Sequence, residues 1–246
     1  MKSKKALLLS IFLTILIALL VSIFSEIDKP QPSAVKITRV IDGDTLVTET
    51  GETIRLVNIN TPEKSEFGYG EAKEFLSTFE NKSVEIEFLG PDKYGRSLAR
   101  IYYPKYLNLE LVERGFAKKF LVQESETKTF DSAENLAVQN SIGMWKHSEF
   151  FDCFEIEVFP KKETVTIKNN CNEINVLDWT IQDESRKKYK FNNTHITQLT
   201  LHSSSGIDNS NDIFWNLESD VWNNDRDTFY LFNEKGEIAA HESYGY

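Results

Sequence analysis

The sequence is poor in cysteine, histidine and methionine, and it has no excess of positive charge. Its 246 residues include 2 cysteines, 4 histidines and 2 methionines. Two cysteines are too few for a disulfide framework, and the four histidines are scattered without the spacing of a metal site. The formal net charge of −10 argues against a protein that coats nucleic acid through bulk charge. Hydrophobic residues make up 40% of the chain, which is typical of a globular protein.

The N-terminus carries a hydrophobic run over residues 6–24, which follows three lysines and contains no charged residue. At 1.5 Å per residue, roughly 20 apolar residues cross a bilayer as a helix. The run predicts a transmembrane signal anchor over 1–25, or a signal peptide if it is cleaved. By the positive-inside rule, everything after residue 25 then lies outside the cytoplasm, either membrane-anchored through this helix or secreted.

A polar segment with two prolines, 26–34, reads as a linker, and short alternating segments follow it over 35–150. Five expected strands and three expected helices in about 115 residues favour a small closed barrel with helices packed on it. The strands are expected at 35–41, 45–48, 53–59, 84–88 and 98–103, and the helices at 70–79, 107–116 and 132–145.

The pattern changes near residue 151, after which short period-two runs are separated by Asn- and Asp-rich turns. Runs at 154–159, 164–167 and 175–181 predict an all-β sandwich over 151–246. The fold class is therefore mainly β, with two domains. Outside the cytoplasm, Cys153 and Cys171 become candidates for a disulfide bridge.

Three stretches of the first domain place charge at turns and strand ends. Residues 42–45 read Asp-Gly-Asp-Thr, residues 55–63 begin with Arg and end with Glu, and residues 92–96 read Asp-Lys-Tyr-Gly-Arg. Carboxylates suit a hard cation, and planar Arg matches a phosphate bidentately. A carboxylate can also deprotonate an attacking water. This set of groups is the one that phosphodiester hydrolysis uses.

The segments 40–45, 54–63 and 92–103 resemble the three signature blocks of the staphylococcal nuclease, or thermonuclease, family. The segments 107–120 and 142–145 also fit, so the resemblance covers roughly 35–147 in order. It implies a five-stranded OB-fold barrel and a hydrolase, a Ca²⁺-dependent endonuclease that cleaves DNA and RNA and leaves 3′-phosphates.

The resemblance also implies the metal ligands, carried over by position. Asp44 is expected to bind Ca²⁺ beside the main-chain oxygen of Thr61, with Asp42 supporting the ligands from behind. Asn60 stands where the family archetype has Asp, so one formal charge is lost. Because affinity follows ligand charge, we expect weaker Ca²⁺ binding at Asn60.

The catalytic and substrate-binding residues follow in the same way. Glu63 is expected to position or activate water, and Arg55 and Arg96 to clamp the scissile phosphate. Lys93 and Tyr94 are expected to contact a neighbouring phosphate. A structural reading stays open, in which Arg55 pairs with Glu63 and Lys93 and Tyr94 are surface residues.

The second domain resembles a lamin-tail domain at 168–191 and 221–238. That resemblance implies an immunoglobulin-like sandwich with a docking role toward an unknown surface ligand. Two other functions compete with an extracytoplasmic nuclease. In the first, the barrel of 35–150 binds nucleic acid without cutting it. In the second, the domain over 151–246 carries the main function, which is adhesion.

Overall fold

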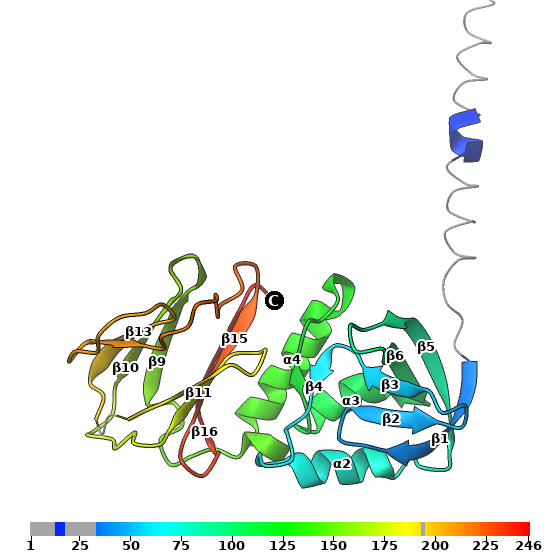
Figure 1. The fold of residues 1–246 in the computed structure, drawn as a ribbon, viewed down its shortest axis with the longest axis horizontal. Helices are drawn as coiled ribbons and strands as arrows, with labels where there is room; N and C mark the ends of the chain where they lie inside the picture. The colour runs from blue at the N-terminus through cyan, green and yellow to red at the C-terminus, as the bar shows by residue number, and fades with distance from the viewer. Residues whose placement is uncertain (1–12, 18–32, 193–194) are drawn as a thin grey trace, which may run out of the picture.

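A computed structural model describes residues 13–17, 33–192 and 195–246 of the chain (Figure 1). Residues 13–17 are helical. Most of the hydrophobic run 6–24 and of the linker 26–34 lies outside the described residues, so that only residues 13–17 of the predicted signal anchor are described. Among the residues that are described, no helix is long and apolar enough to cross a membrane.

Five strands of the N-terminal half close into a barrel. They hydrogen-bond in the order β3-β2-β1-β5-β6, and β3 also pairs in parallel with β6, which closes the circle. A short strand β7 extends the sheet beyond β6. The bounds are β1 Ser33–Val40, β2 Thr45–Thr48, β3 Thr53–Leu56, β5 Ser83–Pro91, β6 Ser97–Tyr103 and β7 Lys105–Tyr106.

Alternation along these strands builds the core of the barrel. Ile37, Leu46, Ile54, Ile86 and Ile101 are completely buried, and each comes from a different strand. Their neighbours along the strand point outward, which is the period-two pattern of a sheet with one face against a core. The structure confirms the predicted barrel, except that the strand expected over 53–59 ends at residue 56 and the short strand β4, Ile59–Asn60, follows a turn.

Three helices pack against the barrel: α2 Tyr69–Ser77, α3 Leu107–Glu113 and α4 Thr127–Gln139. The predictions for α2 and α3 are confirmed within a few residues at each end. The prediction of one helix over 132–145 was wrong: α4 begins at 127 and ends at 139, and Gly143–Trp145 forms a separate 3₁₀ turn. Ser141, which lies between them, and Gly143, the first residue of the turn, have positive φ angles of 55° and 60°, which a continuing helix cannot accommodate.

A small two-stranded sheet fixes the segment that leaves β3. The strand β4 pairs with β8, Lys118–Lys119, so that Asn60 lies opposite Lys118. The buried side chain of Asn108 supports the same region, because its amide donates to the carbonyls of Val57 and Ala99 at 2.9 and 3.1 Å. The backbone that carries Asn60 and its neighbours is therefore held from two sides.

The C-terminal part consists of two four-stranded sheets with an apolar core between them. One sheet has the order β14-β13-β10-β9 and the other β12-β11-β15-β16. Buried residues of both sheets belong to one cluster. The bounds are β9 Phe154–Phe159, β10 Thr164–Asn169, β11 Thr180–Gln182, β12 Lys188–Lys190, β13 Gln198–His202, β14 Asp212–Phe214, β15 Asp227–Phe232 and β16 Ile238–Tyr244.

The prediction of a strand over 175–181 was wrong for most of its length, because only Thr180–Gln182 is a strand. The side chain of Asn175 accepts a hydrogen bond from the amide of Leu177 at 3.0 Å, and Asp178 has a φ of 66°. Both features bend the chain locally. A disulfide joins Cys153 to Cys171 and ties the start of β9 to the loop after β10.

The two β-rich parts meet along α4, which stands between the barrel and the strands β15 and β16 in Figure 1. A third apolar cluster spans the junction and includes Val138, Trp145, Tyr230 and Ile238. At its edge the buried carboxylate of Glu134 bonds residues from both parts. The junction is thus a packed apolar core of its own rather than a hinge between independent bodies.

Candidate active site

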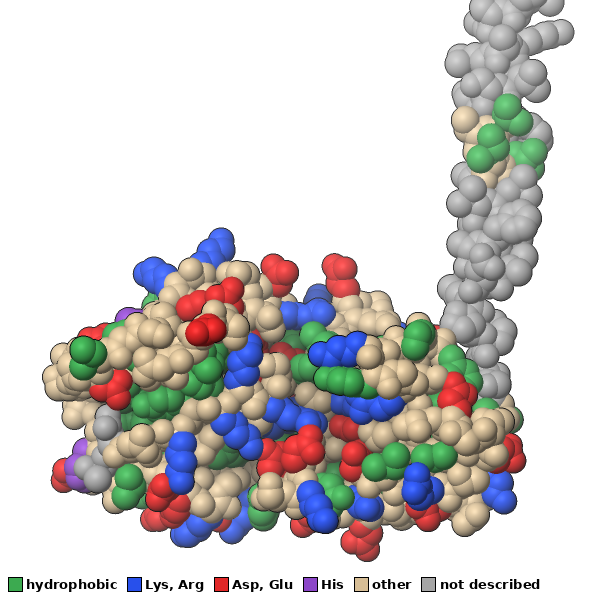
Figure 2. All heavy atoms as spheres, in the orientation of Figure 1, with side chains coloured by type: hydrophobic (Ala, Val, Ile, Leu, Met, Phe, Trp, Pro, Cys, Tyr) green, Lys and Arg blue, Asp and Glu red, His purple; other side chains and the backbone are tan. Residues whose placement is uncertain are grey.

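One cleft of about 830 Å³ on the barrel collects the charged residues of the three signature blocks. Figure 2 shows basic and acidic side chains close together where the barrel meets the C-terminal sheets. Ser185 and Arg186, which come from the C-terminal part, also line the cleft. The lining residues that the sequence singled out are Asp42, Asp44, Arg55, Asn60, Thr61, Glu63, Lys93, Tyr94 and Arg96.

The turn between β1 and β2 presents Asp44 to the cleft. The Asp42 carboxylate accepts a hydrogen bond from the Asp44 amide at 3.1 Å and so shapes the turn. Gly43 is required because a Cβ there would lie 2.7 Å from the Cβ of Ala72 and 2.8 Å from that of Thr61. Burial, together with the neighbouring charge of Asp44, raises the pKa of Asp42 above its ordinary value.

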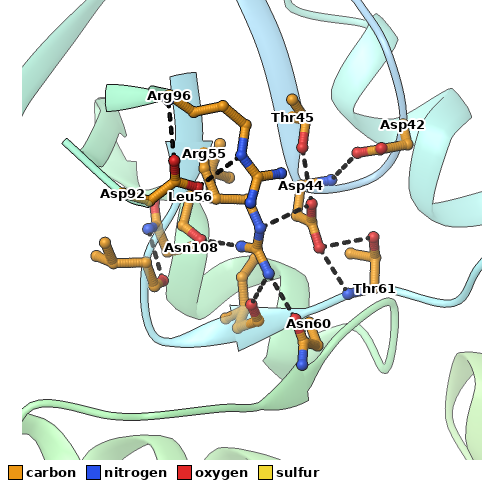
Figure 3. Close-up of polar contacts among 12 residues, drawn as sticks. Asp42, Asp44, Thr45, Arg55, Leu56, Asn60, Thr61, Asp92, Arg96 and Asn108 are labelled. Atoms are coloured by element: carbon orange, nitrogen blue, oxygen red, sulfur yellow. Dashed lines mark hydrogen bonds and ion pairs between the residues drawn. The ribbon is translucent and has the colours of Figure 1, made fainter. Parts of the chain in front are cut away.

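Asp44 itself is buried, and both of its carboxylate oxygens have partners (Figure 3). Oδ1 accepts from the Thr45 hydroxyl at 3.0 Å and lies 3.2 Å from Nε of Arg55. Oδ2 accepts from the amide and the hydroxyl of Thr61 at 3.0 and 3.1 Å. Asp44 therefore connects the β1–β2 turn to strand β3 and to the segment after β4.

Arg55 projects from β3 into the middle of this group. Its terminal nitrogens donate to the carbonyls of Leu56 and Ile59 and, at 2.5 Å, to the side-chain oxygen of Asn60. Burial lowers the pKa of Arg55, and the charge of Asp44 opposes that effect. Because four of the five N–H groups are used inside the protein, Arg55 is held rigidly with its charge facing the cleft.

The hairpin between β5 and β6 supplies a more accessible guanidinium. The carboxylate of Asp92 accepts from the amides of Tyr94 and Arg96 at 2.8 and 2.9 Å, and from Nε of Arg96 at 2.8 Å. The ring of Tyr94 is exposed, and the cationic ends of Lys93 and Arg96 lie 5.0 and 5.6 Å from its centre. The two terminal nitrogens of the Arg96 guanidinium remain free to face the cleft.

Glu63 stands at the rim, where its side chain is 62% exposed, and it forms an ion pair with Arg186. The same guanidinium donates to the carbonyl oxygen of Thr61 at 2.8 Å and lies 3.8 Å from Oδ2 of Asp44. The alternative structural reading, in which Arg55 pairs with Glu63, is not seen. Arg55 pairs with Asp44, and Arg186 takes the contact with Glu63.

The oxygens expected to hold Ca²⁺ are of the right chemical type, since all come from carboxylate, amide or carbonyl groups. In this arrangement they do not fit a divalent ion, because each already faces a cationic donor. Asn60 and Asp44 face Arg55, and the Thr61 carbonyl faces Arg186. Across the described ranges, no three His, Cys, Asp or Glu side chains cluster so as to hold a metal.

Comparisons with known proteins agree with this geometry. The family described as "Staphylococcal nuclease homologue" matches residues 53–147. A Haemophilus influenzae protein described as an uncharacterized endonuclease is 34% identical over 121 residues, which cover 47% of this chain and 67% of that protein. The chain belongs to the staphylococcal nuclease family. An Escherichia coli O157:H7 protein with the same description is 29% identical over 119 residues, covering 46% of this chain and 78% of its own.

A third relative, from Methanocaldococcus jannaschii and described as an uncharacterized protein, is 32% identical over 149 residues, or 72% of its length. All of these matches concern about half of this staphylococcal nuclease homologue, and the C-terminal sheets lie largely beyond the family match.

Sequence reasoning missed two residues of the cleft. Asp92 belongs to a signature block, but its role in holding Arg96 becomes visible only in the hairpin geometry. Arg186 lies 123 residues after its partner Glu63, within the segment 168–191 that resembles a lamin-tail domain, and nothing in that segment marks a role in the nuclease cleft. Leu121, an exposed apolar side chain, also lines the cleft.

Proposed function

We propose that this chain is an endonuclease that hydrolyses phosphodiester bonds of DNA and RNA to 3′-phosphate products. The observation that carries the proposal is the convergence of all nine motif residues on one cleft. Two guanidinium groups from the motifs face that cleft, Arg55 from strand β3 and Arg96 from the hairpin between β5 and β6. Such fixed cations suit an anionic phosphate whose charge grows in the transition state.

The chain's own residues suggest how the reaction proceeds. Arg96, and the edge of Arg55 not used within the protein, bind the oxygens of the scissile phosphate. The carboxylate of Glu63 is close enough to solvent to accept a proton from the attacking water. The water oxygen bonds to phosphorus while the bond to the 5′-oxygen breaks, and that oxygen takes a proton from solvent as it leaves. Lys93 and Tyr94 contact the neighbouring phosphate.

Calcium belongs to the proposal through the family resemblance. When bound, such an ion supplies positive charge at the phosphate. Asp44, Asn60 and Thr61 are the residues that would offer oxygens to it, with Asp42 behind them. Because these oxygens face Arg55 and Arg186 in the structure, we assign no step of the reaction to the ion.

The C-terminal part is proposed to be a lamin-tail-like, immunoglobulin-like sandwich that docks the nuclease to a surface ligand. The two facing four-stranded sheets support this interpretation. We further propose an extracytoplasmic location, anchored through residues 1–25 or secreted if they are removed. The Cys153–Cys171 disulfide supports this location, since disulfides persist in oxidising compartments.

Cleavage of single-stranded DNA by the full chain tests the proposal. Glu63→Gln is expected to lower turnover by about 10²–10⁴-fold, because general-base catalysis contributes that much. Glu71→Gln, at an exposed position on α2 outside the cleft, is the matched control and is expected to retain the activity. Equal cleavage rates for the wild type and Glu63→Gln would show that the proposed role of Glu63 is wrong. A wild type that binds the DNA without cutting it would instead be a nucleic-acid-binding protein.

A further inference from the structure

The hairpin between β11 and β12 is shaped to present Arg186. The carboxylate of Asp183 accepts hydrogen bonds from the Lys187 amide at 2.6 Å and from the Ser185 hydroxyl at 2.5 Å, which closes the turn. Arg186 adopts a φ of 75°, in the left-handed region that a residue with a side chain rarely takes. A conformation of this kind persists only where surrounding structure imposes it, and it is common at functional sites.

Contacts on both sides of Arg186 hold the hairpin against the barrel. Lys188 forms an ion pair with Glu66 of the barrel. Gln182, at the other end of the turn, accepts a hydrogen bond from the buried amine of Lys118 at 2.6 Å. The guanidinium of Arg186 is therefore delivered to the cleft by an anchored element rather than by a free loop.

The guanidinium of Arg186 contacts three oxygen-bearing groups. They are the Asp44 carboxylate at 3.8 Å, the Thr61 carbonyl at 2.8 Å and the Glu63 carboxylate. A surface ion pair needs only a carboxylate partner. Here the cation also bonds a main-chain carbonyl, which is a ligand that a hard metal ion uses.

We propose that Arg186 is the resident cation of the active site and that a divalent ion reaches the oxygens of Asp44 and Thr61 only by displacing it. This inference rests on the proposed nuclease function. Calcium requires oxygen ligands at 2.3–2.6 Å, and the Arg186 nitrogen already lies 2.8 Å from the Thr61 oxygen. Both cations cannot occupy this position together, since like charges in a partly buried site repel strongly.

Through Arg186, the C-terminal part becomes a component of the active site. Arg186 pairs with Glu63 and covers the Thr61 carbonyl, and its withdrawal frees that carbonyl and the side of Asp44 that faces it. The C-terminal part thereby sets how much divalent cation the nuclease requires, without touching the barrel motifs themselves.

Calcium titration calorimetry on the full chain tests this inference. The wild type is compared with Arg186→Gln, and with Lys187→Gln as the control on the same turn. Lys187 donates to the Asp220 carbonyl at 2.7 Å and does not line the cleft. We expect Arg186→Gln to bind Ca²⁺ at least tenfold more tightly than the wild type, and Lys187→Gln to match the wild type. Equal affinities of the wild type and Arg186→Gln, or no binding by Arg186→Gln, would overturn the inference.

A second readout uses the unmodified chain, in case Arg186→Gln does not fold. Saturating Ca²⁺ is expected to increase amide hydrogen exchange in the turn 183–187 at least severalfold, because Arg186 leaves its partners. Ca²⁺ binding with unchanged exchange there would overturn the inference. DNA cleavage is recorded separately. If the wild type cleaves DNA but the wild type and Arg186→Gln bind Ca²⁺ equally well, the proposed role of Arg186 is wrong and the nuclease function stands. If the wild type does not cleave DNA, the nuclease function is wrong, whatever the two Ca²⁺ affinities are.

Discussion

The buried carboxylate of Glu134 provides the sharpest test of how the two β-rich parts are joined. It lies on α4 and is fully buried. It pairs with the amine of Lys119 at 2.9 Å, accepts from the Tyr230 hydroxyl at 2.9 Å and lies 3.3 Å from the His241 ring. Tyr230 and His241 belong to the C-terminal part, whereas Lys119 belongs to the barrel. Replacing Glu134 by Gln removes the charge and leaves Asp131, at 3.2 Å, as the remaining carboxylate paired with the buried ammonium of Lys119.

Two estimates of the cost agree. Breaking a buried ion pair by removing one partner costs about 3–5 kcal/mol. Burial opposes ionisation of Glu134, but Lys119 and His241 lower its pKa from 4.5 to about 2. At 1.36 kcal/mol per pH unit, this corresponds to about 3 kcal/mol of folding free energy. Because the pKa is lowered by folding, this contribution is complete above pH 4.5 and is lost as the pH falls through 2.

Urea denaturation of the wild type and Glu134→Gln at pH 7 measures this cost. We expect Glu134→Gln to lose about 3–5 kcal/mol, and the difference to shrink below pH 4.5. Glu124→Gln, at an exposed residue just before α4, is the control and should change stability by less than about 0.5 kcal/mol. A loss as small as the control's would refute the reasoning that this carboxylate joins the two parts.

Two further predictions concern stability. Burial lowers the pKa of Lys118 to about 7, so the unfolded chain binds one more proton between pH 7 and 10.5, and stability rises with pH there. Relative to Lys118→Met, the wild type should therefore gain about 2 kcal/mol from pH 7 to pH 9 in urea denaturation; no gain would contradict the lowered pKa. The disulfide closes an 18-residue separation, so Cys153→Ala with Cys171→Ala should lower the unfolding free energy by about 3 kcal/mol. Two free thiols in alkylation mass spectrometry of the wild type would contradict the bridge.

Most of the fold could be predicted because its signals are local. Period-two alternation marked β1, β5 and β6, and helical spacing marked α2 and α3. The failures have local causes too. The helix predicted to 145 ends at Gln139 because of the positive φ angles at Ser141 and Gly143, and the strand predicted from 175 is broken by an Asn side-chain turn.

The candidate site was predictable as far as its residues share contiguous motifs. Asp44, Arg55 and Arg96 lie on strand ends and hairpins whose spacing the family keeps, and the barrel brings them together. Arg186 could not be predicted, because its role depends on how the β11–β12 hairpin docks on the barrel. Nothing in its neighbouring residues encodes that docking, which depends on packing between parts distant in sequence.

Arg96 offers the most direct test of the central claim, that the barrel cleft cuts nucleic acid with fixed guanidinium groups. Its side chain is held by Asp92 through Nε, and it lines the cleft. The measurement is the rate at which the full chain cleaves single-stranded DNA, compared with Arg96→Gln and with Arg39→Gln, an exposed arginine on β1 outside the cleft. The account predicts cleavage by the wild type and Arg39→Gln, and a loss of about 10²–10³-fold in turnover for Arg96→Gln. A folded Arg96→Gln that cleaves as fast as the wild type would contradict it.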